Sequence, residues 1–374
     1  MAIDKITTAS ITDANITTAK LAYDAIPFRN IIINGDMSIA QRATSTTGVT
    51  TSDGYYACDR WYSQTDTGTW TISQSTDVPT GQGFFNSFKM DCTSAGSSNA
   101  DEVMIRSKHE GQNLQYLKYG TTNASSLTLS FWIKSNKTGN YYLAIVNNNS
   151  TQDRVVSFGY TIDSANTWEK KTITIPGDTA RSIDNTNGEE LTLYWLFSAA
   201  GGFTSGGVSN TWTNYAANRF ANSDLAGLGG STSDYVNITG VQLEAGTTAS
   251  DFEFLPYDVN LNRCLRYFYK WVSINIYNNI CIGKVQSAKN ARGVYQLPTI
   301  MRTSPSLAAD GNFRMVAGGA ATGTGSDISV IRNNTDTQFM NWVFSGGTDS
   351  TASQACEMGA NNDTSAEIAF SAEL

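Results

Sequence analysis

The sequence predicts an all-β protein: an extended N-terminal repeat, a β-sandwich, a short helix and a smaller C-terminal β-sandwich tip. Strand-like runs recur along most of the chain and are separated by clusters of glycine, asparagine, serine and aspartate. Hydrophobic residues make up 40% of the 374 residues and aromatic residues 11%, which is enough to bury sizeable cores. The length suits two domains and a shorter additional segment.

A five-residue repeat over residues 6–26 marks the first segment. Its aliphatic positions are Ile6, Ile11, Ile16, Leu21 and Ile26. This spacing matches neither the 3.6-residue period of an amphipathic helix nor the two-residue period of a strand. Burying one such side chain gains about 1.5–3 kcal/mol, whereas ordering each of about 25 residues costs roughly 1–2 kcal/mol. We therefore predict that residues 1–27 wind together with other copies as an anchor; the alternative is a flexible low-complexity tail.

Residues 28–256 are predicted to form a sandwich or jelly roll of many short strands. The run LTLSFWI at residues 127–133 alternates large apolar residues with threonine and serine, so one face of this strand points inward. Trp61, Trp132 and Trp195 lie in strand-like runs, and we expect all three in the core. Residues 257–374 are predicted to form the tip, beginning with a helix over residues 258–270 that has Asp258 as its N-cap.

Charge and cysteine content exclude several classes of protein. The formal net charge is -8, and the lysines and arginines are scattered singly, so we expect no nucleic-acid partner. No apolar stretch approaches the roughly 18–20 residues that span a bilayer, so we expect no membrane insertion. The 5 cysteines are odd in number and far apart, which favours buried reduced thiols and folding in a cytoplasm.

The sequence offers little for catalysis. The one histidine, His109, is expected at the surface or in a loop and cannot build a multi-histidine metal site. Glu169, Glu189 and Glu190 are candidates for a glycosidase pair, but adjacent strand residues point to opposite faces, which counts against the last two acting together. We therefore expect no enzyme and no cofactor; a structural calcium ion held by carboxylates and carbonyls stays open.

Two aromatic residues are candidates for contact with a sugar. Trp212 and Tyr215 lie in the polar stretch SNTWTNY at residues 209–215, which we expect to be a loop. Tryptophan and tyrosine offer a flat apolar face with a polar edge, and this combination suits a sugar ring.

Several motifs, in the same order along the chain, resemble those of a widespread family of bacteriophage tail-fibre and virion structural proteins. They are NIIINGDMSIAQR at residues 30–42, CDRW at 58–61, VQLEAGTTASDFEFLPY at 241–257, LNRCLRYFY at 261–269, LPTIMRTSP at 297–305 and FSAEL at 370–374. The chain departs from the family pattern at Leu255 and Asn260, where the family has arginine and glutamate. From the residues themselves these motifs are framework: Glu244, for example, is placed to tie a strand to its turn.

The resemblance implies a carbohydrate-binding-module-like jelly roll, a homotrimer, and attachment to other virion proteins in a particle assembled in the host cytoplasm. On this basis we expect a phage tail fibre or virion appendage that is anchored by its N-terminal repeat and binds a host-surface glycan. One alternative is a purely structural virion component, such as a capsid fibre, cement or tail adaptor. Another is a glycan hydrolase of the tailspike kind.

Overall fold

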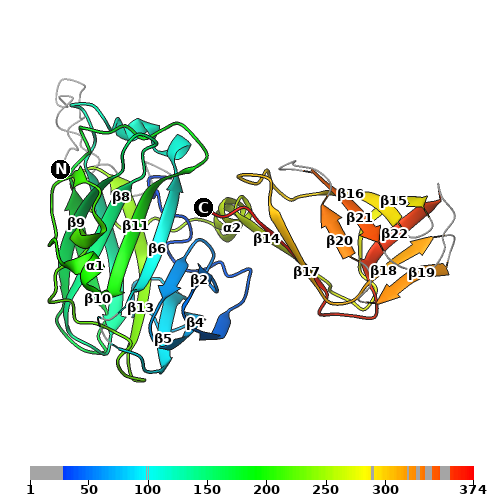
Figure 1. Cartoon of the computed structure of the whole chain (residues 1–374), viewed down its shortest axis with the longest axis horizontal. Coiled ribbons are helices and arrows are strands. Elements are labelled where there is room, and N and C mark those ends of the chain that lie inside the picture. The colour runs from blue at the N-terminus through cyan, green and yellow to red at the C-terminus, as the bar shows by residue number, and fades with distance from the viewer. Residues whose placement is uncertain are drawn as a thin grey trace, which may run out of the picture. The chain divides into compact units, whose positions relative to one another are not determined.

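The computed structural model describes residues 28–97, 99, 101–287, 290–317, 320–325, 329–332, 339–345 and 354–374. The predicted anchor with Ile6, Ile11, Ile16, Leu21 and Ile26 lies outside these residues. The chain divides into two compact units, the first ending at Pro256 and the second spanning Tyr257–Leu374. Both are built of antiparallel strands with a few short helices, so the predicted all-β fold is confirmed (Figure 1).

Unit 1 is a jelly-roll β-sandwich of two sheets. In spatial order, the six-stranded sheet contains β1 (Ser45–Val49), β4 (Thr69–Ser75), β5 (Ser87–Ser94), β13 (Tyr235–Ala245), β7 (Leu127–Ser135) and β10 (Glu169–Ile175). The seven-stranded sheet contains β12 (Thr213–Asn214), β9 (Arg154–Ile162), β8 (Gly139–Asn147), β11 (Glu189–Ser198), β6 (Val103–Glu110), β3 (Tyr62–Thr65) and β2 (Ser52–Tyr55). The short helices are α1 (Gly201–Thr204), η3 (Gly111–Asn113), η4 (Gln115–Leu117) and η5 (Ala217–Arg219).

Aromatic rings from both sheets meet in the core between them. Trp61 and Trp195 are fully buried with ring centroids 5.6 Å apart, and Phe131 of the facing sheet contacts Trp195 at 6.0 Å. The expectation for Trp132 is wrong: it is only half-buried, because the two-residue period of β7 turns it away from the core-facing Phe131.

The motif around Asn34 forms a buried polar junction. The Asn34 side-chain nitrogen donates to the carbonyls of Ile39 and Asp59, at 2.9 Å each, and its side-chain oxygen accepts from the Ile39 amide at 2.9 Å. Trp61 Nε1 donates to the Asn34 carbonyl at 2.9 Å. Asn34 has φ 58°, a left-handed conformation that asparagine tolerates better than most residues.

The first described residues of unit 1 are joined to residues near its last one, Pro256. Arg29 donates from Nε to Ser250 Oγ at 2.9 Å and from Nη2 to the Asp251 carbonyl at 2.7 Å, and the Asn30 amide donates to Glu253 Oε2 at 2.9 Å.

Glu244 plays its predicted part at this junction. Its carboxylate accepts from the Ser250 amide at 2.8 Å and from the Ser250 hydroxyl at 2.7 Å. The glutamate thereby ties the end of β13 to the turn that follows it.

His109 and the cysteines lie inside. His109 is in β6, is buried, and has Nε2 3.2 Å from Ser107 Oγ, so its expected surface or loop position is wrong. The alternation of β6 explains this, because His109, Ser107 and Ile105 share the core side of the strand. All 5 cysteines are buried, as predicted.

Unit 2 begins with a shorter helix than predicted. Helix α2 spans Tyr257–Leu265, so Asp258 lies in its first turn, and the expected continuation to residue 270 is wrong because Phe268–Val272 forms strand β14. This run, FYKWV, is aromatic and β-branched, and such residues favour strands.

Two sheets complete unit 2. The three-stranded sheet has the order β14, β23 (Glu367–Ser371) and β17 (Ser306–Asp310). The seven-stranded one contains β19 (Ala320–Gly325), β18 (Phe313–Ala317), β22 (Ala355–Ala360), β15 (Asn279–Ser287), β16 (Asn290–Gln296), β21 (Phe339–Ser345) and β20 (Ser329–Arg332). Val285, Met315, Met358, Ile368 and Phe370 are fully buried between them.

Candidate functional site

The two residues predicted to contact a glycan have different surroundings. Trp212 forms hydrogen bonds through its side chain and its backbone: the indole Nε1 donates to the Pro176 carbonyl at 2.6 Å, and the Trp212 backbone carbonyl accepts from Arg154 Nη2 at 2.7 Å. Its ring is partly buried against Tyr119, with centroids 6.1 Å apart. Tyr215 is 46% exposed, and its backbone amide donates to the Asp153 carbonyl at 3.0 Å. Trp212 therefore holds the loop in place, whereas Tyr215 faces solvent.

A row of aromatic and basic side chains crosses the outer face of the seven-stranded sheet of unit 1. Tyr55 of β2 is paired with Tyr62 of β3, Tyr62 with Arg106 of β6, and Arg106 with Tyr194 of β11. We call these four residues the tyrosine ladder. They point away from the core because their strand neighbours, such as Trp61, Ile105 and Trp195, are fully buried on the opposite side.

Each member of the tyrosine ladder contacts the next. The Tyr55 and Tyr62 rings meet edge to face, with centroids 5.2 Å apart. The Arg106 guanidinium carbon lies over Tyr62 at 5.3 Å from its centroid and over Tyr194 at 5.1 Å. The guanidinium carbon therefore lies over two aromatic rings, an arrangement that stabilises the cation.

The same cross-strand row continues into small residues that are covered by a loop. Tyr194 is paired with Ala144, which is paired with Ser157 of β9. The Ser157 hydroxyl donates to the Arg219 carbonyl at 2.6 Å, which fixes the segment that contains α1 and η5 over this part of the sheet. In Figure 1, α1 is drawn on the viewer's side of the seven-stranded sheet. Phe220 packs against Tyr194 at 5.0 Å, so the covering loop ends beside the ladder.

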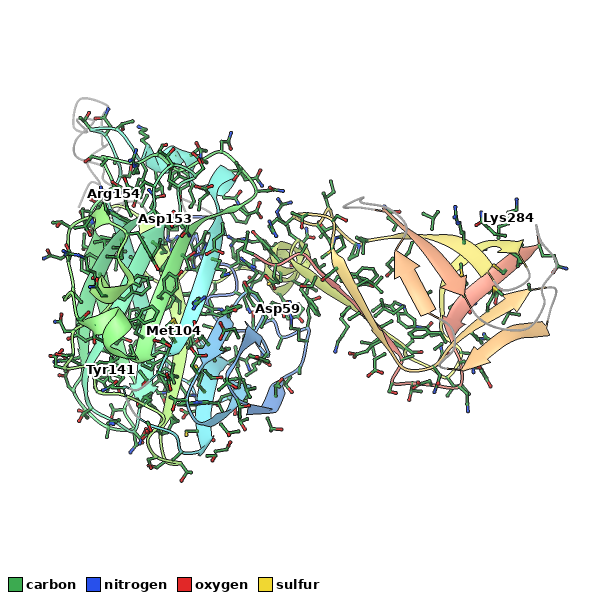
Figure 2. All side chains as sticks on the ribbon, viewed as in Figure 1. Asp59, Met104, Tyr141, Asp153, Arg154 and Lys284 are labelled. Carbon is green, nitrogen blue, oxygen red and sulfur yellow. The ribbon has the colours of Figure 1, made fainter. Side chains whose placement is uncertain are left out.

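Charged side chains flank the tyrosine ladder. Lys108 Nζ lies 4.9 Å from the Tyr62 ring centroid and forms an ion pair with Glu189 Oε2 at 3.0 Å. Burial raises the pKa of the Asp53 carboxyl, while the neighbouring Tyr62 hydroxyl and Arg106 charge oppose this rise. Asp153, immediately before β9, lies close enough to Glu189 for the Glu189 charge to act on the Asp153 carboxyl. Figure 2 shows Asp153 and Arg154 near one end of the seven-stranded sheet and Met104, two residues before Arg106, farther along it.

Burial and these charges shift the pKa values of the site. Burial raises the pKa of Tyr194 to about 12; the Arg106 charge opposes this rise, and the carboxylates of Glu189 and Asp153 add to it. Burial, with the neighbouring Glu189, also raises the pKa of Asp153. Tyr194 consequently keeps its proton at neutral pH and can both donate and accept a hydrogen bond.

The carboxylates that were considered for hydrolysis have structural partners. Glu169 accepts from the Ser164 amide at 2.8 Å and pairs with Lys171 at 2.6 Å. Glu189 is held by Lys108, while Glu190 accepts from the Asp184 amide at 3.2 Å. These contacts stabilise turns and the sheet surface.

Other features of the described chain concern ions and membranes. Across the described residues, no three or more histidine, cysteine, aspartate or glutamate side chains are placed to hold a metal ion. In the same part of the chain, no helix combines the length and hydrophobicity needed to cross a membrane.

Sequence reasoning missed Tyr62, Arg106 and Tyr194. One signal was present: if Trp195 is in the core, the alternation of a strand turns Tyr194 outward. The neighbours of Tyr194 on that face depend on the pairing of β3, β6 and β11, whose sequences lie far apart.

Comparison with known proteins gives distant structural similarities only. No family model matches the chain, and no curated protein matches its sequence. Tailspike protein 4 of bacteriophage CBA120, in its enzymatically active domain, is similar with a TM-score of 0.32 and 14% identity over 59% of this chain and 22% of the tailspike chain.

Two carbohydrate-binding modules are also similar. The xylan-binding CBM22-2 domain of Paenibacillus barcinonensis Xyn10C has a TM-score of 0.29 and 14% identity, covering 50% of this chain and 91% of that domain. The family 11 module of Clostridium thermocellum, in complex with a mixed-linked tetrasaccharide, has a TM-score of 0.24 and 12% identity, covering 55% and 99%.

Proposed function

We propose that unit 1 binds a glycan through the tyrosine ladder. The observation that carries this proposal is the paired row Tyr55–Tyr62–Arg106–Tyr194 on the outer face of a rigid sheet. Such a row presents phenol hydroxyls, guanidinium donors and ring edges in fixed positions, with Tyr215 beside it. Sugars carry hydroxyls on an apolar ring, and binding sites combine aromatic contact with a few oriented polar groups.

At the level of the whole chain, we propose a homotrimeric phage tail fibre or virion appendage. Residues 1–27 attach it to other virion proteins, and the protein resides in the virion after assembly in the host cytoplasm. The motifs at residues 30–42 and 241–257 support this through their resemblance to that family. The role is binding, strengthened by several copies engaging one surface, and not catalysis.

The test compares ladder variants for binding to host-surface polysaccharide. We expect Tyr62→Ala and Tyr194→Ala each to weaken binding at least about tenfold, because buried aromatic anchors dominate such interfaces. Tyr116→Ala is the matched control, since this tyrosine is 52% exposed on η4. Equal binding by all three variants would remove the ladder from the proposal.

The alternatives give different results. Saturable binding to host cells by the wild-type chain supports a receptor role, and its absence favours the purely structural virion component. Release of oligosaccharides from the polysaccharide, abolished by one aspartate or glutamate substitution, would establish the hydrolase instead.

The trimer has an independent test. Light scattering should give three times the chain mass, and replacing Ile11 and Ile16 by aspartate should lower the mass to that of one chain while leaving the sandwich folded. A wild-type chain that runs as a monomer would contradict this part of the proposal.

A further inference from the structure

The Arg106 side chain has unused hydrogen-bonding capacity. Its Nε is buried without a hydrogen-bond partner, and its guanidinium makes no ion pair or hydrogen bond to the described residues. The other ladder cation differs, because Lys108 is paired with Glu189 at 3.0 Å. Arg106 is therefore a cation at the centre of the ladder that forms no ion pair with a described residue, while the Asp53 carboxylate lies near enough for the two charges to interact.

The neighbouring rings limit how a ligand can reach this cation. Tyr62 and Tyr194 stand on the strands on either side of Arg106, and the guanidinium carbon lies over both rings, 5.3 and 5.1 Å from their centroids. With a ring on each side of the guanidinium carbon, a ligand would contact this group through its N–H donors. Those donors match the two oxygens of a carboxylate or phosphate in bidentate geometry.

Acceptors lie on both sides of this central donor. On one side the Asp53 carboxylate lies near Tyr62 and Arg106. On the other, the charges of Glu189 and Asp153 act on Tyr194. Carboxylates repel a second anion but accept hydrogen bonds from hydroxyls. The order across the ladder is therefore acceptor, donor, acceptor.

We infer that the tyrosine ladder selects an acidic glycan in which one carboxylate or phosphate binds Arg106 and the hydroxyls on either side of it meet the flanking carboxylates. This inference rests on the proposed glycan-binding function and names its ligand class. A uniformly charged polyanion fits less well, because its neighbouring anions would face Asp53 and Glu189.

The first experiment uses the full chain and polymers with and without charge. The probes are polygalacturonate that has been partly carboxyl-reduced so that its remaining carboxylates are isolated, fully carboxyl-reduced polygalacturonate, and neutral galactan with and without sparse phosphate esters, together with host polysaccharide before and after carboxyl reduction or dephosphorylation. The variants are Arg106→Gln and Arg106→Lys. Arg181→Gln is the control, because Arg181 Nη2 donates to Gln152 Oε1 at 2.9 Å and Arg181 lies outside the ladder.

We expect an acidic polymer to bind at least tenfold more tightly than its neutral counterpart, with weaker binding as salt rises. Arg106→Gln should bring the two affinities together, Arg106→Lys should recover only part of the difference, and Arg181→Gln should change neither. The carboxylate and phosphate arms identify the acidic group. If the neutral polymer binds as tightly as the acidic polymer, and Tyr62→Ala still abolishes binding, the inference is overturned but the proposed function is kept. No binding of any glycan would remove both.

A second measurement does not depend on the identity of the sugar. The Arg106 Nε–H resonance, assigned by its absence in Arg106→Gln, is titrated with sodium glucuronate, glucose 1-phosphate and glucose. A shift with either acidic sugar and none with glucose supports the inference, whereas equal shifts with all three, or a shift shared by the Arg181 resonance, argue against it.

Discussion

Replacing Asp178 with alanine is expected to destabilise unit 1 by about 3–5 kcal/mol, the range for breaking a buried ion pair. The Asp178 side chain is 0% exposed, and its Oδ2 lies 3.1 Å from Arg154 Nε, whose side chain is 15% exposed. The Nε–H does not point at this oxygen in hydrogen-bond geometry, so the contact is electrostatic. Asn147 Nδ2 also donates to Oδ2 at 3.2 Å, and the Ala180 amide donates to Oδ1 at 3.0 Å.

The substitution removes the anion but leaves the Arg154 cation and the Asn147 amide in place, largely shielded from water. At roughly 2–4 °C per kcal/mol for a unit of this size, the Tm of unit 1 should fall by about 6–20 °C. Differential scanning calorimetry of the full chain measures this as a shift of one transition, because the two units are compact bodies that can unfold separately.

Asp163→Ala is the control for the removal of a carboxylate from an ion pair. Asp163 is 3.4 Å from Lys171 Nζ but its side chain is 72% exposed, so solvent screens the pair and the expected loss is below about 1 kcal/mol. Equal, small Tm losses for Asp178→Ala and Asp163→Ala would show that burial does not strengthen the Arg154–Asp178 interaction, and the reasoning would fail.

Three further predictions concern unit 1. Gly240→Ala should lower the free energy of unfolding in urea by about 1–3 kcal/mol, because Gly240 has φ +60° and an added Cβ would lie 2.5 Å from Phe84 Cζ. Gly81→Ala is its control, since Gly81 has φ +76° but nothing lies within 4 Å of an added Cβ. This control measures the cost of the backbone conformation alone, so it should lower the stability by less. Glu244→Ala should cost about 1–3 kcal/mol in chemical denaturation, since the Ser250 amide and hydroxyl lose their acceptor, and an unchanged midpoint would refute that role. Burial raises the pKa values of Tyr141 and Tyr194 to about 12. The stability that the two protonated side chains contribute is therefore full below about pH 10 and is lost as the pH rises towards 12. The unfolding midpoint should be lower at pH 11 than at pH 9, and this difference should be smaller in Tyr141→Phe.

The buried faces of strands were predictable from the sequence because they depend on neighbours along the chain. The alternation at residues 127–133 correctly places Phe131 in the core, and the same rule, applied strictly, would have turned Trp132 outward. The helix at residues 258–270 was predicted too long, since apolar spacing alone cannot separate a helical turn from the start of β14.

The tyrosine ladder was not predictable, because it exists only through strand pairing. Tyr62 and Tyr194 are 132 positions apart, yet both are paired with Arg106. Composition and local pattern carry no information about which strand lies next to which. Trp212 and Tyr215 were found because their loop is polar in sequence, but the bond from Trp212 to Pro176 again depends on a distant segment.

The bonds from Arg29 and Asn30 to residues 250–253 determine how mechanical load passes through unit 1. The segments at residues 29–30 and 250–253 are fastened side by side, so tension applied to the chain at these two segments is carried by this short clasp of hydrogen bonds. The two sheets of unit 1 do not carry this tension. A pull on the chain would therefore strain the clasp first and leave the tyrosine ladder undistorted.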